Sequence, residues 1–317
     1  MSDVTAVDSL VQKYQQLQQE IGKVIIGQKE AVNFTLLSIF CGGHSLLIGV
    51  PGLAKTLLVN TISSALGLNF KRIQFTPDLM PSDILGSEIL DESRQFKFIK
   101  GPIFSNIILA DEINRTPPKT QAALLEAMQE RSVTVSGQHY KLDLPFFVLA
   151  TQNPIEQEGT YPLPEAQLDR FMFSINLEYP TFEEEVQVVK NTTNVTQQTI
   201  NSLFSAQEIV EVQKLIRKIP VTDNVIEYAV SLVGKTRPNS EMATDLVKQY
   251  LDWGAGPRAS QNLILGAKAH AAVNGKYSPD IEDVQAVAVP ILSHRIVKNY
   301  KAEAEGITIK EIITSLF

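Results

Sequence analysis

The chain has 317 residues, of which 44% are hydrophobic and 20% charged, the ordinary composition of a globular protein. No apolar run in it reaches the length that spans a membrane, and the polar N-terminus MSDVTAVDSLVQKYQQLQQE argues against a signal peptide. The net charge of -7 argues against a broad face for binding duplex DNA, and the single Cys41 excludes an internal disulfide and favours a reducing cytoplasm.

The first part of the chain reads as two helices followed by a short strand. Apolar residues recur at helical spacing in the Gln-rich segment 8–22, which predicts a helix that docks on the rest of the protein. GQKEAVNFTLLSIFCGG (27–43) predicts a second helix, and its closing glycine pair is a stop signal. The apolar run HSLLIG (44–49) has the length of a buried strand.

The loop GVPGLAKT (49–56) follows that strand and leads into a predicted helix, KTLLVNTISSALG (55–67). A phosphate-binding loop has Gly, four residues, Gly, Lys and Ser or Thr, and its backbone N–H groups face the anion. Ala54 stands at the second glycine, and it can serve there if its backbone is ordinarily helical. Lys55 is then placed to reach the β- and γ-phosphates, and Thr56 to give its hydroxyl to Mg²⁺. The alternative is a chance loop before a helix.

Further apolar runs predict the rest of a sheet. Helical patterns lie between several of them, and apolar strands separated by helices indicate a parallel sheet covered on both faces, the α/β class. Two other stretches, GSEILDESRQFKFIKG (86–101) and RSVTVSGQHYKL (131–142), alternate around polar turns and predict β-hairpins. The predicted strands are KRIQF (71–75), NIILADE (106–112), PFFVLATQN (145–153) and FMFSINL (171–177).

The character of the chain changes after Pro180. No strand candidate of any strength follows, and helical patterns fill residues 182–317. We therefore predict two domains, an αβα nucleotide-binding core at 1–180 and an all-helical domain at 181–317. The polar stretch KNTTNVTQQTINS (190–202) is the predicted linker.

Two adjacent acids, Asp111 and Glu112, end the apolar part of IILADEIN (107–114). Carboxylates at the end of a buried strand are costly unless they have a partner or a task. Beside a Lys-Thr loop, Asp111 is placed to hold Mg²⁺, usually through water, next to Thr56. Glu112 is placed to orient and polarise the water that attacks the γ-phosphate. The alternative is a strand end with two solvated acids.

Polar residues also end the next apolar run. FFVLATQNP (146–154) closes on an amide, Asn153, which is placed to position the same water. In YPLPEAQLDRF (161–171), Arg170 lies between Asp169 and the last predicted strand. Arg170 is either an arginine finger offered to the nucleotide of a neighbouring subunit, or the partner of Asp169 in a surface ion pair of little energetic value.

A second arginine opens a predicted helix in the C-terminal half. In WGAGPRASQNLILGAKAHA (253–271), glycines and a proline break the chain just before Arg258. A cation at a helix N-terminus is electrostatically unfavourable, so Arg258 needs an outside anion, and a nucleotide phosphate would serve. The alternative is an exposed arginine paired with solvent or with a nearby acid.

These stretches, in this order, resemble the motifs of the AAA+ ATPases, and more narrowly those of the MoxR family, in the clade with an insert in the second helix. The resemblance runs from VIIGQKEAV (24–32) to about residue 300. GVPGLAKT resembles the Walker A loop, where Ala is common at the place of Ala54. IILADEIN resembles Walker B, and ATQNP resembles sensor 1. GTYPLPEAQLDRF resembles the finger segment, and GAGPRAS resembles sensor 2, with Gly256 where Ser is usual.

The resemblance implies a P-loop NTPase fold, in which a parallel five-stranded sheet lies between helices and a small all-α lid follows. It implies catalytic roles for Glu112, Asn153 and Arg170, with Thr56 and Asp111 at the metal. It also places the two hairpins toward the centre or face of a ring, where they meet a client. The implied nucleotide site comprises Gly49, Val50, Pro51, Gly52, Leu53, Ala54, Lys55, Thr56, Leu57 and Arg258, with Val24 and Ile26 at the adenine base unless these two only pack in the core.

In function, the resemblance implies Mg²⁺-dependent hydrolysis of ATP to ADP at the subunit interfaces of a homo-oligomeric ring, expected to be a hexamer. The implied output is chaperone-like remodelling or maturation of a client protein in the cytoplasm, with a partner that carries a von Willebrand factor A domain. That domain is not in this chain, so such a partner is a separate protein.

Three other functions stay open at this stage. A nucleic-acid motor needs basic hairpin tips, and the hairpin at 86–101 mixes its basic residues with Glu88, Asp91 and Glu92. A magnesium-chelatase-like motor subunit is a close relative. A nucleotide-gated scaffold without catalysis is disfavoured because Glu112 and Arg170 are both present.

Overall fold

Two packed helices open the fold. The computed structural model describes residues 3–90, 92, 94–156, 159–193 and 198–317. Helix α1 (Asp3–Gly22) begins earlier than the predicted residue 8, and α2 (Lys29–Cys41) follows it. Gly42 ends α2 in the left-handed conformation, with φ at 69°, so the glycine stop signal in the sequence is confirmed.

A five-stranded, all-parallel sheet forms the centre of the protein, with the strand order β2-β5-β8-β1-β9. Each strand overlaps one of the predicted apolar runs, so the predicted α/β fold is confirmed. The strands are β1 (Ser45–Ile48), β2 (Phe70–Gln74), β5 (Ile107–Asp111), β8 (Phe147–Gln152) and β9 (Phe173–Asn176), and the flanking helices include α3 (Lys55–Ala65) and α5 (Pro118–Glu130).

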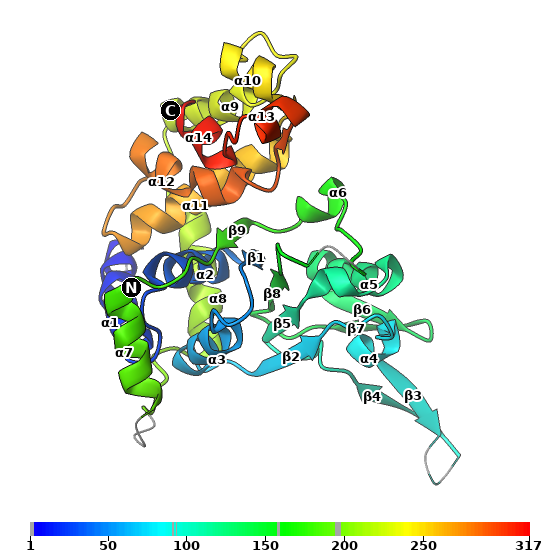
Figure 1. Ribbon diagram of the computed structural model, residues 1–317. Coiled ribbons are helices and arrows are strands. Elements are labelled where there is room, and N and C mark those ends of the chain that lie inside the picture. The colour runs from blue at the N-terminus through cyan, green and yellow to red at the C-terminus, as the bar shows by residue number, and fades with distance from the viewer. Residues whose placement is uncertain (1–2, 91, 93, 157–158, 194–197) are drawn as a thin grey trace.

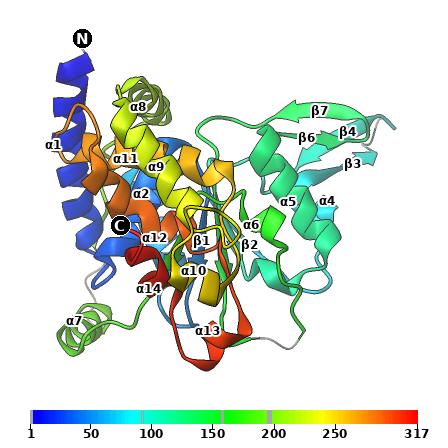
Figure 2. The same cartoon turned by 90° about the horizontal axis from the view of Figure 1, so that it is seen from above.

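The sheet separates two apolar cores, because alternate strand residues point to opposite faces. In β5, Ile107 and Leu109 belong to the core that α2 and α3 cover, whereas Ile108 and Ala110 belong to the core that α5 covers. Figure 2 shows the sheet between α2 on one side and α5 on the other, and Figure 1 shows the same layers from a second direction. Strands that are covered on both faces are apolar throughout, which is why they read as continuous runs.

Both predicted hairpins are present, and in both views they lie at the end of the molecule opposite to α1 (Figures 1 and 2). Residues 91 and 93 of the first hairpin lie outside the described residues. Phe98 in the first hairpin stacks on Tyr140 in the second, with ring centroids 4.3 Å apart, so the two hairpins are joined. The first follows α4 (Pro81–Leu85) and consists of β3 (Gly86–Leu90) and β4 (Phe96–Lys100), and the second consists of β6 (Ser132–Val135) and β7 (Gln138–Lys141).

Helices dominate the C-terminal half, and most of those after residue 222 lie in the upper part of Figure 1. One prediction is wrong here, because β10 (Leu251–Trp253) and β11 (Val297–Lys298) form an antiparallel pair. These strands have three and two residues, too few to show the alternation that identifies a strand in a sequence. The remaining helical elements are η1 (Ile113–Arg115), α6 (Glu165–Leu168), α7 (Phe182–Thr192), α8 (Ala206–Lys218), α9 (Asp223–Lys235), α10 (Asp245–Tyr250), α11 (Pro257–Val273), α12 (Ile281–Leu292), α13 (Tyr300–Ala304) and α14 (Ile309–Thr314).

The helices after the sheet pack back onto the first two helices of the chain. Both α8 and α11 contact α1 and α2, so one apolar core includes residues from either side of Pro180. The predicted linker at 190–202 overlaps the end of α7, and its residues 194–197 lie outside the described ones. The domain boundary at 180 therefore stays a prediction. Among the described helices, none combines the length and the apolar character needed to cross a bilayer.

Candidate active site

The sequence motifs meet at the carboxyl-terminal edge of the sheet. Ile48, the last residue of β1, pairs with Gln152, the last residue of β8, and Gln74 of β2 pairs with Asp111 of β5. Because these strands all run in one direction, the phosphate loop, the acid pair and the amide that follow them lie at one edge. In open α/β sheets this is the edge where ligands bind.

The phosphate loop ends at the N-terminus of α3, where no side chain caps the helix and the first backbone N–H groups are left for a ligand. Gly49 is required by close approach, since a Cβ there would lie 2.9 Å from Leu177 Cβ. The condition set for Ala54, an ordinarily helical backbone, is not met, because its φ is 53°, in the left-handed region. Alanine in that conformation costs roughly 1–2 kcal/mol, because its Cβ crowds the carbonyl oxygen.

Lys55 folds back over the loop and donates a hydrogen bond to the Gly49 carbonyl oxygen. Partial burial lowers the pKa of Lys55, while the nearby carboxylates, Asp111 first among them, act to raise it. The ammonium group thus lies between the loop and the acid pair. A phosphate bound in the loop would offer it a stronger acceptor than a neutral carbonyl.

Asp111 is buried, with 8% of its surface exposed, and both of its carboxylate oxygens have partners. Oδ1 accepts a hydrogen bond from the Thr151 hydroxyl at 2.6 Å, and Oδ2 accepts two from the Arg72 guanidinium at 2.6 and 3.0 Å. Each carboxylate oxygen has two lone pairs, so Oδ1 keeps one free. The carboxylate of Asp111 and the hydroxyl of Thr56 are hard oxygen donors of the kind Mg²⁺ prefers, and the residues therefore fit that ion.

Glu112 lies directly after β5 with φ at 57°. This left-handed conformation costs a residue other than glycine about 1–3 kcal/mol. Its backbone N–H donates to the Thr151 hydroxyl at 2.8 Å, so Thr151 links the two acids. Its Oε2 accepts hydrogen bonds from Gln74 at 2.8 Å and from Arg115 at 3.0 Å. These contacts fix the direction in which the carboxylate points.

Sequence reasoning missed these partners of the acids. Arg72 and Gln74 are polar residues at alternate positions of β2, on either side of the buried Ile73. That alternation, in a strand expected to be covered on both faces, was the available signal. Thr151 was visible only as a polar strand end, and nothing in the sequence pattern points to Arg115.

Asn153 follows β8 and is buried, with its Oδ1 accepting a hydrogen bond from the Ile155 backbone N–H at 3.1 Å. The structure thus places the amide at the expected edge, while its catalytic role stays a prediction. The loop is tied to the same strand, because the Gly49 N–H donates to the Gln152 carbonyl at 3.3 Å.

A mostly apolar pocket opens beside the phosphate loop. The predicted adenine segment, with Val24 and Ile26, lines it together with the loop and the first turn of α3. Helix α7 lines the pocket as well, and sequence reasoning missed this contribution. The lining residues are Val24, Ile25, Ile26, Gln28, Gly52, Leu53, Ala54, Leu57, Leu58, Pro180, Val188, Asn191 and Thr192.

The two predicted arginines lie away from that pocket, around Asp169. Arg170 donates to the Leu125 carbonyl at 2.9 Å and lines a different pocket, on α5. The alternative of an ion pair between Arg170 and Asp169 is wrong, because Asp169 pairs with Arg258 at 3.2 Å and with Arg295 at 2.7 Å. For Arg258 the predicted alternative, pairing with a nearby acid, is what the structure shows.

Comparisons with known proteins agree with this geometry. Residues 44–173 match the ATPase family associated with various cellular activities (AAA), and residues 243–316 match the AAA lid domain. Chaperone MoxR1 of Mycobacterium tuberculosis is 42% identical over 295 residues, which cover 93% of this chain and 78% of that protein. The chain belongs to the MoxR family of AAA+ ATPases.

Other MoxR-family comparisons cover almost the whole chain. YeaC of Bacillus subtilis, an uncharacterized protein, is 40% identical over 300 residues, which cover 94% of this chain and 91% of YeaC. The crystal structure of a Cytophaga hutchinsonii protein proposed to be an ATPase has a TM-score of 0.91 and 46% identity. That match covers 98% of this chain and 94% of the other. The MoxR resemblance of the motifs and the AAA+ fold are thus confirmed.

Proposed function

We propose that this MoxR-family AAA+ ATPase hydrolyses ATP in a Mg²⁺-dependent reaction at the subunit interfaces of a homo-oligomeric ring. The observation that carries the proposal is the meeting of a Lys-Thr phosphate loop with Asp111 and Glu112 at one edge of a parallel sheet. The loop binds an anion, and the two acids supply a metal ligand and a base. That combination is what phosphoryl transfer to water requires.

Nucleotide binding is assigned to the loop and the pocket beside it. The backbone N–H groups of 49–56 and the N-terminus of α3 receive the phosphates. Lys55 exchanges the Gly49 carbonyl for the β- and γ-phosphates. The base enters the pocket lined by Val24, Ile26 and Leu57. Thr56 and Asp111 would hold Mg²⁺, which neutralises charge on the phosphates when bound.

The hydrolytic step is assigned to Glu112 and Asn153. Glu112 accepts a proton from a water molecule, and Asn153 orients that water. The water oxygen forms a bond to the γ-phosphorus as the bond from that phosphorus to the β–γ bridging oxygen breaks. ADP and phosphate then leave. Gln74 and Arg115 keep the Glu112 carboxylate aimed, and Oε1 of Glu112 is the oxygen they leave for the water.

The two arginines are assigned to the charge that develops on the transferred phosphoryl group. Arg170 acts from the adjacent subunit, and Arg258 responds to the γ-phosphate from the helical lid. Loss of the γ-phosphate then moves the lid at 181–317 relative to the core at 1–180. This is a hinge type of switch.

The output is assigned as chaperone-like remodelling or maturation of a client protein. One relative bears the name chaperone, which supports this part of the proposal. The ring is expected to be a hexamer that works in the cytoplasm with a separate von Willebrand factor A domain protein.

Glu112→Gln tests the proposal. The variant keeps the shape of the side chain and loses the base, so we expect ATP binding near wild type and turnover lower by about 10²–10⁴-fold. Calorimetric titration with ATP measures the binding, and a phosphate-release assay measures the turnover. Glu227→Gln, an exposed position on α9, is the matched control and should retain full turnover. Turnover close to wild type in Glu112→Gln contradicts the assignment.

A further inference from the structure

Residues 169–172, between α6 and β9, carry Arg170 and have little helical support of their own. Helix α6 has four residues, none of them buried. The segment is held instead by Arg295, which lies just beyond the C-terminal end of α12. This residue was not among the candidates that the sequence supplied.

Arg295 is almost completely enclosed, with 2% of its side chain exposed. A guanidinium has five N–H donors, and that of Arg295 makes five hydrogen bonds. Nε donates to Asp169 Oδ1 at 2.7 Å. Nη2 donates to the Phe171 carbonyl at 2.6 Å and to the Asp169 carbonyl at 3.3 Å. Nη1 donates to the Met172 carbonyl at 3.2 Å and to the Ile291 carbonyl. These contacts lie on both sides of Arg170.

The carboxylate of Asp169 pairs with two arginines that differ in exposure. Oδ1 bonds to the buried Arg295, and Oδ2 bonds to Arg258 at 3.2 Å, whose side chain is 48% exposed. The ion pair with Arg295 already balances the charge of Asp169, so Asp169 does not need Arg258. The exposed arginine is therefore free to exchange Asp169 for another anion while the segment stays in place.

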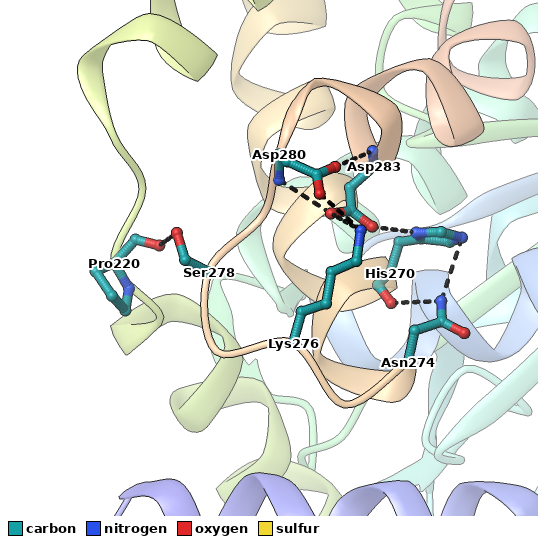
Figure 3. Close-up of polar contacts among 7 residues, drawn as sticks. All are labelled: Pro220, His270, Asn274, Lys276, Ser278, Asp280 and Asp283. Carbon is teal, nitrogen blue, oxygen red and sulfur yellow. Dashed lines mark hydrogen bonds and ion pairs between the residues drawn. The ribbon is translucent and has the colours of Figure 1, made fainter.

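Helix α11, which carries Arg258, and helix α12, which Arg295 follows, are tied to each other at their other ends (Figure 3). Asp283 in the first turn of α12 is buried and accepts hydrogen bonds from His270 Nδ1 at 2.7 Å and from Lys276 Nζ at 3.1 Å. Since His270 lies in the last turn of α11, this cluster fixes the connection between the helices. The opposite ends are fixed on Asp169.

We propose that Arg295 is a positioning residue for ATP hydrolysis, which holds the backbone on both sides of Arg170 so that the finger keeps its place at the subunit interface. This inference rests on the proposed function of Arg170. Lysine at this position keeps the charge but has three donors on a single nitrogen, so it cannot make the five hydrogen bonds that Arg295 distributes over three nitrogens.

Arg295→Lys in the full chain tests the inference. Misplacing a catalytic group by about 1 Å costs as much as 10²-fold, so we expect kcat lower by about 10- to 100-fold. The KM for ATP and the affinity for ADP should stay within about twofold, because the variant's own phosphate loop is untouched. Unchanged kcat overturns the inference.

Asp283→Asn is the control for a merely structural effect. It weakens the same pair of helices at the end away from Asp169, so the unfolding temperature should fall while kcat per folded chain stays at the wild-type value. An equal loss of kcat in Asp283→Asn and Arg295→Lys overturns the inference. If Arg295→Lys does not fold, Asp169→Asn decides. It removes the charged bond between Arg295 Nε and the segment, which weakens the hold on Arg170, so kcat should fall with KM unchanged. Full activity overturns the inference.

Mixed assemblies separate this inference from the proposed function. Arg295→Lys subunits retain Glu112, and Glu112→Gln subunits retain a correctly held Arg170. Mixing the two should restore turnover above the average of the separate variants, and no restoration overturns the inference. Failure of the proposed function is distinct, because it shows in wild-type protein that lacks turnover or in Glu112→Gln that keeps it.

Discussion

The sheet edge with the acid pair and the segment with Arg170 are held together in opposite ways. Asp111, Glu112 and Thr151 lie at or next to the ends of neighbouring strands, so main-chain pairing alone brings them within hydrogen-bond distance. The 169–172 segment depends on Arg295, whose side chain comes from 126 positions away in the chain. A site supported by the sheet is therefore insensitive to distant substitutions, whereas one supported by a single buried side chain depends on the packing of α11 and α12.

A buried neutral histidine supports the opposite edge of the sheet, and another supports the 169–172 segment. His44 accepts the Val148 N–H at 3.0 Å and donates to the Met128 carbonyl at 3.1 Å, which fixes the start of β8 and the end of α5. Burial lowers the pKa of His44 to about 4. His294 donates to the Phe171 carbonyl at 2.9 Å, and burial also lowers its pKa.

The largest expected effect is the loss of stability in acid. His44 in the unfolded chain takes up a proton near pH 6.5, and the folded chain resists until about pH 4. The unfolded state therefore binds more protons in this window, and His44 alone should lower the free energy of unfolding by about 3 kcal/mol as pH falls through it. Urea denaturation across that range measures the change. His44→Gln should flatten part of the slope, and His294→Gln a separate part. A slope unaffected by either substitution would contradict the assignment.

Thr151→Val should have the next largest effect, and it is confined to the sheet edge. Valine keeps the volume but removes the hydroxyl that bonds to Asp111 Oδ1 and to the Glu112 N–H. We expect this loss to lower the free energy of unfolding by about 2 kcal/mol. The control is Thr35→Val, since among the described residues the buried Thr35 Oγ1 has no hydrogen-bond partner. That change should be neutral or stabilising. Equal losses in both variants would show that Thr151 acts only by packing.

Ala54→Gly should give the smallest effect, and of opposite sign. Glycine removes the left-handed strain at the phosphate loop but gains freedom in the unfolded chain, so we expect about 0.5 kcal/mol of net stabilisation. Ala206→Gly, at the first position of α8, should instead destabilise the protein by a similar amount. Urea midpoints compare the two. Destabilisation by Ala54→Gly would mean that the alanine conformation is not strained.

The sequence predicted those parts of the protein whose signals are local. The apolar runs at 44–49, 106–112 and 145–153 identified three neighbouring strands, because a strand buried on both faces is apolar throughout. The backbone conformation of Ala54 could not be predicted, since an amino-acid type does not reveal a strained φ. Arg295 was invisible because its five partners lie on other elements, and only tertiary packing brings them to it. The strands at 251–253 and 297–298 were too short to recognise.

The stacking of Phe98 on Tyr140 has a mechanical consequence. Phe104 lies against both rings, with centroids 5.7 and 6.4 Å away, so three aromatic side chains connect the hairpins β3–β4 and β6–β7. Each aromatic pair contributes about 0.5–1.5 kcal/mol beyond its buried area. A load applied to either hairpin is thus shared by both, and it is passed on to α4 and α5, which contact β3 and β6.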